Sequence, residues 1–149
     1  MGEIIGIATR TKTRAPMDLC ASANILFDKG VGADSRGLKK GNRQVTVMSI
    51  EDWDVVCSEL GQLIPWTTRR ANILLSGIDL KQTKGCLLKL GDCTLEITGE
   101  LVPCDRMDEQ FNGLTKTLSY DWRGGVTCKI IKEGFISVND NVSIINSLK

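Results

Sequence analysis

The chain has 149 residues, of which 42% are hydrophobic and 25% charged, and its formal net charge is +1. This size and balance predict a single domain spanning residues 1–149, with enough apolar surface to form a core without disulfide bonds. The sequence contains no histidine, which excludes Ser-His-Asp and Cys-His catalysis and every zinc site that needs an imidazole ligand.

The chain begins MGEIIGIATR, without the basic segment and apolar run of a signal peptide. No apolar run approaches the length of a transmembrane helix. We therefore expect a cytoplasmic protein with no membrane partner. Its six cysteines form no C-x-x-C pair, and in a reducing compartment most of them are expected to be free thiols in the core.

Residues 3–9 (EIIGIAT) predict an opening strand. Residues 10–43 follow as a long loop with four glycines, carrying eight basic residues against three acidic ones. A loop of this length inside a compact domain is usually functional or disordered. It is either a solvated basic surface or a patch that binds an anion, such as a phosphate or a nucleic acid.

Residues 44–50 (QVTVMSI) predict a second strand, and the clearest helix of the sequence follows it. Ser49 can cap this helix and Gly61 can end it. Apolar residues recur between them at helical spacing, and this pattern places Cys57 on the buried face.

Residues 86–99 (CLLKLGDCTLEITG) predict a β-hairpin that turns at a Gly-Asp pair. Residues 126–145 predict further short strands, broken at 132–134 and at 139–141. Many short strands with tight turns and one clear helix predict a mainly β fold, a barrel or a sandwich with few helices.

No Walker A loop, G-x-S-x-G elbow or EF-hand loop occurs in the sequence. Polar residues instead gather at six loop or strand-end positions, where sites on rigid scaffolds usually lie. These candidate site residues are Lys12, Arg14, Asp34, Ser35, Arg36, Arg43, Gln44, Arg70, Asn72, Cys104 and Arg123.

The order of these segments resembles the MOSC domain, the module named after the C-terminal part of molybdenum cofactor sulfurase. The resemblance runs through GADSRG, RQVTVMSIEDW, LIPWTTRRANILLSGIDL, LKLGDCTLEITGELVPC and WRGGV to GFISVNDNVSI. It implies a distorted β-barrel of short strands with a few short helices. It also implies that Cys104 corresponds to the family's invariant cysteine.

Family members are described as sulfur carriers or as molybdenum-cofactor binders. The resemblance therefore implies that Cys104 carries a persulfide or ligates the metal, and that the arginine-rich loops bind the cofactor's phosphate and pterin edges. The residue-by-residue match covers Asp34, Arg36, Arg43, Gln44, Arg70 and Asn72, while Arg69 is a neighbour of the match.

The resemblance leaves the activity open between a sulfur carrier or transferase and a component of a molybdenum-dependent reductase. The expected partner is a sulfur donor or a redox protein. No segment resembles the pyridoxal-phosphate domain of the full sulfurase, so the chain is expected to be an acceptor or binding module.

Both roles of Cys104 require the thiolate form. Asp105, Asp108 and Glu109 follow closely and would disfavour a thiolate if they faced the sulfur, so arginines must supply positive charge. Pro103 restricts the backbone that enters this segment. The other cysteines are expected to be structural: Cys20, Cys57, Cys86, Cys93 and Cys128.

Two other functions remain open. A non-catalytic domain that binds an anion or a partner through its basic loops would need the arginines but not Cys104. A nucleic-acid binder is the least favoured, because aromatic residues make up only 5% of the chain and its second half is acidic.

Overall fold

The computed structural model describes residues 2–12, 14–32, 34, 38 and 41–146. Within these residues the chain is mainly β, as the sequence predicts. The strands are β1 (Gly2–Thr9), β2 (Asp18–Cys20), β3 (Ser22–Leu26), β4 (Gly30–Val31), β5 (Val45–Ser49), β6 (Ile73–Ser76), β7 (Leu87–Leu90), β8 (Cys93–Glu100), β9 (Val126–Lys132), β10 (Gly134–Ser137) and β11 (Asn141–Ile145). The helices are α1 (Ile50–Leu60), the 3₁₀ helix η1 (Trp66–Arg69), α2 (Met107–Gln110) and α3 (Leu114–Leu118).

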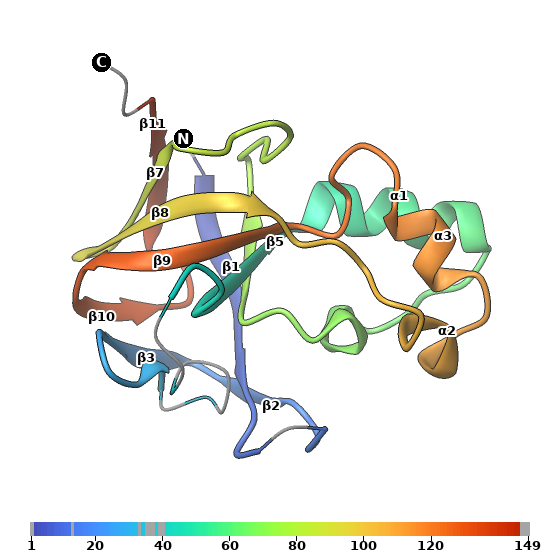
Figure 1. Ribbon diagram of the computed structural model, residues 1–149, viewed down its shortest axis with the longest axis horizontal. Helices are drawn as coiled ribbons and strands as arrows, with labels where there is room; N and C mark the ends of the chain where they lie inside the picture. The colour runs from blue at the N-terminus through green and yellow to red at the C-terminus, as the bar shows by residue number, and fades with distance from the viewer. Residues whose placement is uncertain (1, 13, 33, 35–37, 39–40, 147–149) are drawn as a thin grey trace.

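A closed barrel forms the body of the described chain (Figure 1). Its sheet has eight strands in the order β11-β7-β8-β9-β5-β6-β1-β2. Because β11 also pairs with β1, seven of these strands close into a ring, and β2 is an extra strand beside β1. The distorted β-barrel that the resemblance implies is confirmed.

Alternating apolar side chains fill the barrel. In the hairpin of β7 and β8, Leu88 lies opposite Leu95, and Leu90 lies opposite Cys93. These four side chains are buried, because every second residue of a strand points to the same face of the sheet. The hairpin predicted for residues 86–99 is therefore confirmed, and burial of its inner face contributes to the hydrophobic core.

Helix α1 begins and ends where the sequence predicts. The Ser49 hydroxyl accepts a hydrogen bond of 3.1 Å from the Asp52 amide, and Gly61 ends the helix at a φ of 69°. Trp53 and Val56 pack in a second apolar cluster with Leu114 and other residues of the helical region. Figure 1 shows α1, α2 and α3 together at one end of the barrel.

Residues 10–43 differ from the single long loop predicted for them. They contain β2, β3 and β4, and β3 pairs with both β10 and β4 in a small separate sheet. Ala23 and Ile25 point inward from β3, but two alternating apolar residues are too few to predict a strand from the sequence. Helices α2 and α3 were not predicted either, because four or five residues are too few to show a helical period.

In the described part of the chain, no helix is both long and apolar enough to cross a membrane.

Candidate functional site

A cavity of about 390 Å³ lies beside the barrel and brings together segments that are distant in the sequence. Its lining is basic, with six arginines against a single glutamate. The lining residues are Arg10, Arg14, Arg43, Thr46, Arg69, Arg70, Leu101, Val102, Cys104, Arg106, Met107, Glu109 and Gln110. A concave site with this charge is suited to an anionic ligand.

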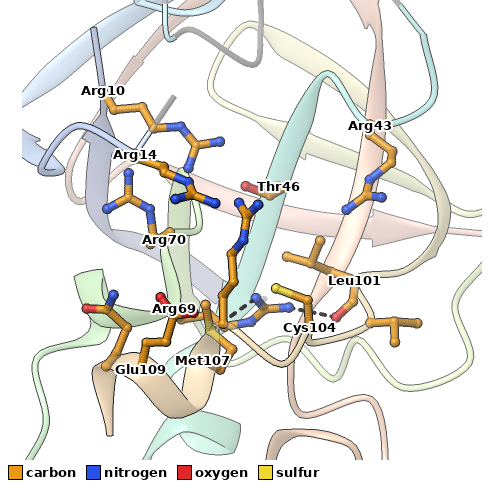
Figure 2. Close-up of a pocket in the computed structure, with 13 residues that line it drawn as sticks. Arg10, Arg14, Arg43, Thr46, Arg69, Arg70, Leu101, Cys104, Met107 and Glu109 are labelled. Carbon is orange, nitrogen blue, oxygen red and sulfur yellow. Dashed lines mark hydrogen bonds between the residues drawn. The ribbon is translucent and has the colours of Figure 1, made fainter. Parts of the chain in front are cut away.

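Three arginines form one wall of the cavity: Arg10, Arg14 and Arg70 (Figure 2). Arg10 and Arg14 follow the end of β1, and Arg70 follows η1. The Arg70 guanidinium donates a hydrogen bond to the Ala15 carbonyl, which ties the two segments together. We call these three residues the arginine wall.

Two members of the arginine wall, Arg10 and Arg70, bring their positive charges close together while both are partly desolvated. Burial lowers the pKa of Arg10, the Asp34 carboxylate opposes this effect, and the neighbouring Arg70 charge lowers the pKa further. Burial also lowers the pKa of Arg70, again opposed by Asp34. A bound anion would relieve this cost, since each guanidinium can donate paired hydrogen bonds to phosphate or carboxylate oxygens.

Two arginines of the cavity have an unusual backbone. Arg14 has a φ of 67° and Arg70 a φ of 69°, in the left-handed region that non-glycine residues rarely adopt. Such conformations cluster at functional sites, where the surrounding structure holds them. Both residues line the cavity.

Cys104 lies across the cavity from the arginine wall (Figure 2). It is an exposed free thiol, and the segment that carries it connects β8 to α2. The carbonyl oxygen of Cys104 accepts hydrogen bonds of 3.0 Å from the Met107 amide and of 3.0 Å from the Thr115 hydroxyl. Pro103 beside it is buried. The backbone of Cys104 is thus held while its sulfur remains accessible.

The acidic residues after Cys104 have different surroundings. Asp108 accepts a hydrogen bond of 2.9 Å from the Thr115 amide, which ties α2 to α3. Asp105 is exposed, and Glu109 lines the cavity. Among these three acids only Glu109 belongs to the cavity wall, and six arginines outweigh its charge.

The structure brings some of the predicted site residues together. Arg14, Arg43 and Arg70 share the cavity with Cys104. Asp34 is buried, with 1% of its surface exposed, and it accepts a hydrogen bond of 2.7 Å from the Arg10 amide. Its negative charge opposes the lowering of the pKa of Arg10 and of Arg70, and so supports the arginine wall. Ser35 and Arg36 lie outside the described residues.

Other predicted site residues lie elsewhere. Lys12 is exposed and is not part of the cavity lining. Gln44 is buried and donates a hydrogen bond of 2.6 Å to the Phe27 carbonyl. Arg123 pairs with Glu59 on helix α1. None of these three lines the cavity that contains Cys104.

Asn72 links three strands behind the cavity. Its amide oxygen accepts hydrogen bonds of 3.2 Å from both the amide and the hydroxyl of Thr46, and its amide nitrogen donates one of 3.2 Å to the Ala8 carbonyl. Only 2% of its surface is exposed. Asn72 thereby fixes Thr46, which does line the cavity.

Three arginines of the lining were not among the predicted site residues: Arg10, Arg69 and Arg106. Arg10 directly follows the first strand, and Arg106 comes two residues after Cys104. Arg10 could have been predicted as a site residue because it lies at a strand end, and Arg106 because it lies close to Cys104. Arg69 directly precedes the predicted Arg70 and was noted as its neighbour, but its contacts with carbonyl groups far along the chain could not be seen in the sequence.

The side chains that the structure describes do not form a metal site on their own. Within the described residues, no group of three or more histidine, cysteine, aspartate or glutamate side chains is placed to hold a metal ion. The Cys104 thiol by itself offers one soft sulfur ligand.

The fold and the site define a small β-barrel domain with an exposed cysteine at an arginine-lined cavity. The family model for the MOSC domain matches residues 15–143, and the chain belongs to that family. The family is generally linked to molybdenum cofactor sulfurase-like function.

Solved structures show the same fold at low sequence identity. The chain is similar to the YuaD protein of Bacillus subtilis, with a TM-score of 0.82 and 17% identity over 99% of this chain and 98% of that one. It is also similar to YiiM of Geobacillus stearothermophilus, with a TM-score of 0.75 and 12% identity over 97% and 75% of the two chains. YiiM of Escherichia coli gives a TM-score of 0.74 and 11% identity over 99% and 71%. Comparison with curated protein sequences finds no match.

Proposed function

We propose that this MOSC domain binds a molybdenum-cofactor-type ligand in its cavity, with Cys104 as the thiolate ligand of the metal. One observation carries the proposal: an exposed free thiol and six arginines line the same cavity. The thiol is a soft ligand for a metal, and the arginines are the residues best shaped to hold a phosphate.

The residues present fit the two ends of such a ligand. The arginine wall of Arg10, Arg14 and Arg70 would hold the phosphate, because Arg10 and Arg70 are partly desolvated and their charges repel each other. Cys104, on the other side, would contribute one sulfur ligand. When bound, the cofactor supplies a redox-active metal that these side chains lack.

The remaining lining residues would orient the ligand rather than react with it. Leu101 and Met107 are buried apolar residues of the lining. Val102 also lines the cavity and is 65% exposed, so it lies on the side that faces solvent. Apolar contacts of this kind, with a few polar groups among them, are typical of small-molecule sites.

The exposure of Cys104 favours a second candidate function, a persulfide carrier. The Cys104 thiolate would attack the outer sulfur of a donor persulfide, R–S–SH. A new bond forms between the two sulfurs, and the donor S–S bond breaks. The products are Cys104–S–SH and the donor thiolate R–S⁻, with no net oxidation or reduction.

The first experiment is the molybdenum and pterin content of protein purified without oxygen from a host that makes the cofactor. We expect wild type to carry both, and Cys104→Ser to lose the metal. Cys20→Ser is the matched control, because Cys20 is a partly buried thiol on β2 outside the cavity lining.

Other outcomes separate the alternatives. Metal and pterin that survive in Cys104→Ser would contradict a ligand role for this cysteine. If neither protein carries cofactor, a mass increase of one sulfur atom on Cys104, lost on reduction, would favour the carrier. If Cys104→Ser changes nothing and Arg70→Gly abolishes phosphate binding, the chain is an anion-binding module.

A further inference from the structure

We propose that Arg69 is the positioning residue for Cys104. This inference rests on the proposed function, in which the Cys104 thiol must face a ligand in the cavity. Arg69 lies at the end of η1, and 5% of its surface is exposed. Its guanidinium is therefore inside the structure, beneath the segment that carries the thiol.

The Arg69 guanidinium contacts the Cys104 segment on both sides of the cysteine. Its Nη2 donates a hydrogen bond of 2.7 Å to the Leu101 carbonyl, three residues before Cys104. Its Nη1 lies 3.7 Å from the Met107 sulfur, three residues after Cys104. The residues drawn in Figure 2 include all of these groups, with the hydrogen bonds dashed.

A third contact fixes the guanidinium to the barrel. Nε of Arg69 donates a hydrogen bond of 3.0 Å to the carbonyl of Gly124, two residues before the start of β9. The main chain adds a bond of 2.8 Å from the Leu101 amide to the Gly125 carbonyl. One planar guanidinium thus joins η1, the start of the Cys104 segment and the entry to β9.

The packing around this contact leaves little space. A Cβ atom added at Gly124 would lie 2.6 Å from the Leu101 carbonyl oxygen and 3.0 Å from Nη2 of Arg69. A side chain at Gly124 would therefore displace the same two groups that Arg69 joins. Gly124→Ala disturbs the contact without removing the arginine or its charge.

Lysine cannot replace this arrangement. Its ammonium is a point charge on a flexible chain, whereas the guanidinium presents donors in a fixed plane that reaches several acceptors at once. Arg69→Lys keeps the positive charge but loses the geometry. It separates a positioning role from a purely electrostatic one.

The test uses ligand-free, full-length protein: wild type, Arg69→Met, Arg69→Lys and Gly124→Ala. Arg43→Met is the matched control, because it removes one positive charge of the same cavity from outside the Cys104 segment. The first readout is amide hydrogen exchange of residues 101–107 relative to the barrel strands. The second is the ratio of Cys104 alkylation rates by anionic iodoacetate and neutral iodoacetamide, followed by mass spectrometry.

If Arg69 positions Cys104, Arg69→Met, Arg69→Lys and Gly124→Ala all exchange the hydrogen-bonded amides of residues 101–107 about tenfold to a hundredfold faster, because buried carbonyls lose their donors. They also lower the preference of Cys104 for iodoacetate, although Arg69→Lys retains its charge. Arg43→Met lowers that preference through charge alone and leaves the exchange unchanged. Should Arg69→Met not fold, Arg69→Lys and Gly124→Ala decide the question.

The proposal is overturned if Arg69→Lys behaves as wild type in both readouts. Faster exchange with an unchanged reagent preference would also overturn it, since Arg69 would then support the backbone without placing the thiol. These readouts need no cofactor. A failure of the metal and pterin experiment would therefore count against the proposed function and leave the Arg69 result intact.

Discussion

Arg123 donates two hydrogen bonds of 2.9 Å to the two carboxylate oxygens of Glu59. The same guanidinium donates one of 3.1 Å to the Thr117 carbonyl and lies 5.6 Å from the centre of the Tyr120 ring. It thereby connects α1 to α3 and to the turn that leads into β9. This is a stabilising contact between helices, outside the cavity lining.

Arg123→Met is therefore expected to lower the free energy of unfolding by about 0.5–1.5 kcal/mol through loss of a paired, partly buried ion contact. Phosphate affinity of the cavity should not change. Urea denaturation and calorimetric titration with phosphate measure the two effects. Lys81→Met removes the exposed pair with Asp121 and serves as the control, with an expected cost below about 1 kcal/mol. Weakened phosphate binding at unchanged stability would place Arg123 in the ligand site.

Asp34→Asn tests the negative charge that Asp34 places near Arg10 and Arg70. An amide oxygen can still accept the hydrogen bond from the Arg10 amide, but the negative charge near Arg10 and Arg70 is lost. We expect the free energy of unfolding to fall by about 1–3 kcal/mol. Added phosphate should recover part of this loss, because a bound anion supplies the missing charge. An equal loss with and without phosphate, measured by urea denaturation, would contradict this account.

Two substitutions at Arg70 can separate its effect on the free energy of unfolding from its effect on phosphate binding. Its φ of 69° favours glycine, so Arg70→Gly should unfold with a free energy about 1 kcal/mol higher than Arg70→Ala. Both variants lose the guanidinium and should lose phosphate binding equally. Paired denaturation curves and phosphate titrations test this. Two variants of equal stability would mean that the left-handed backbone at this position carries no strain.

The buried thiols predict an alkaline loss of stability. Burial raises the pKa of Cys93 to about 12 and also raises the pKa of Cys128. In the unfolded chain a thiol ionises near pH 8.5, whereas these two remain protonated in the fold. Above about pH 8.5 the unfolded state therefore binds fewer protons, and the free energy of unfolding falls by about 1.4 kcal/mol per pH unit for each thiol.

Urea denaturation at a series of pH values from about 6.5 to 10 measures this slope. Cys93→Val should make the dependence of the unfolding free energy on pH less steep. The double variant with Cys128→Val should make it less steep still. Below about pH 8 the slope of wild type and variants should agree, because both states then hold their thiol protons. A slope that is the same in wild type and in the double variant would assign the alkaline loss to other groups.

Structural features that depend on neighbouring residues could be predicted from the sequence. Ser49 caps the start of α1 and Gly61 caps its end, as predicted, because both caps depend on residues within one or two turns. The hairpin of β7 and β8 was likewise predictable from its turn and its alternation. The short strands of residues 10–43 were not, since their pairing with β10 depends on a distant segment.

The sequence by itself determined the fold class and the family, because these depend on residue order and local pattern. It could not distinguish Arg70, on the cavity wall, from Arg123, which pairs with Glu59, since both are arginines at loop ends. Only the tertiary structure decided this, by bringing the ends of β1, β8 and η1 to one cavity. It also gave Arg69 its role, because the carbonyl groups of Leu101 and Gly124 approach that guanidinium only after the barrel has closed.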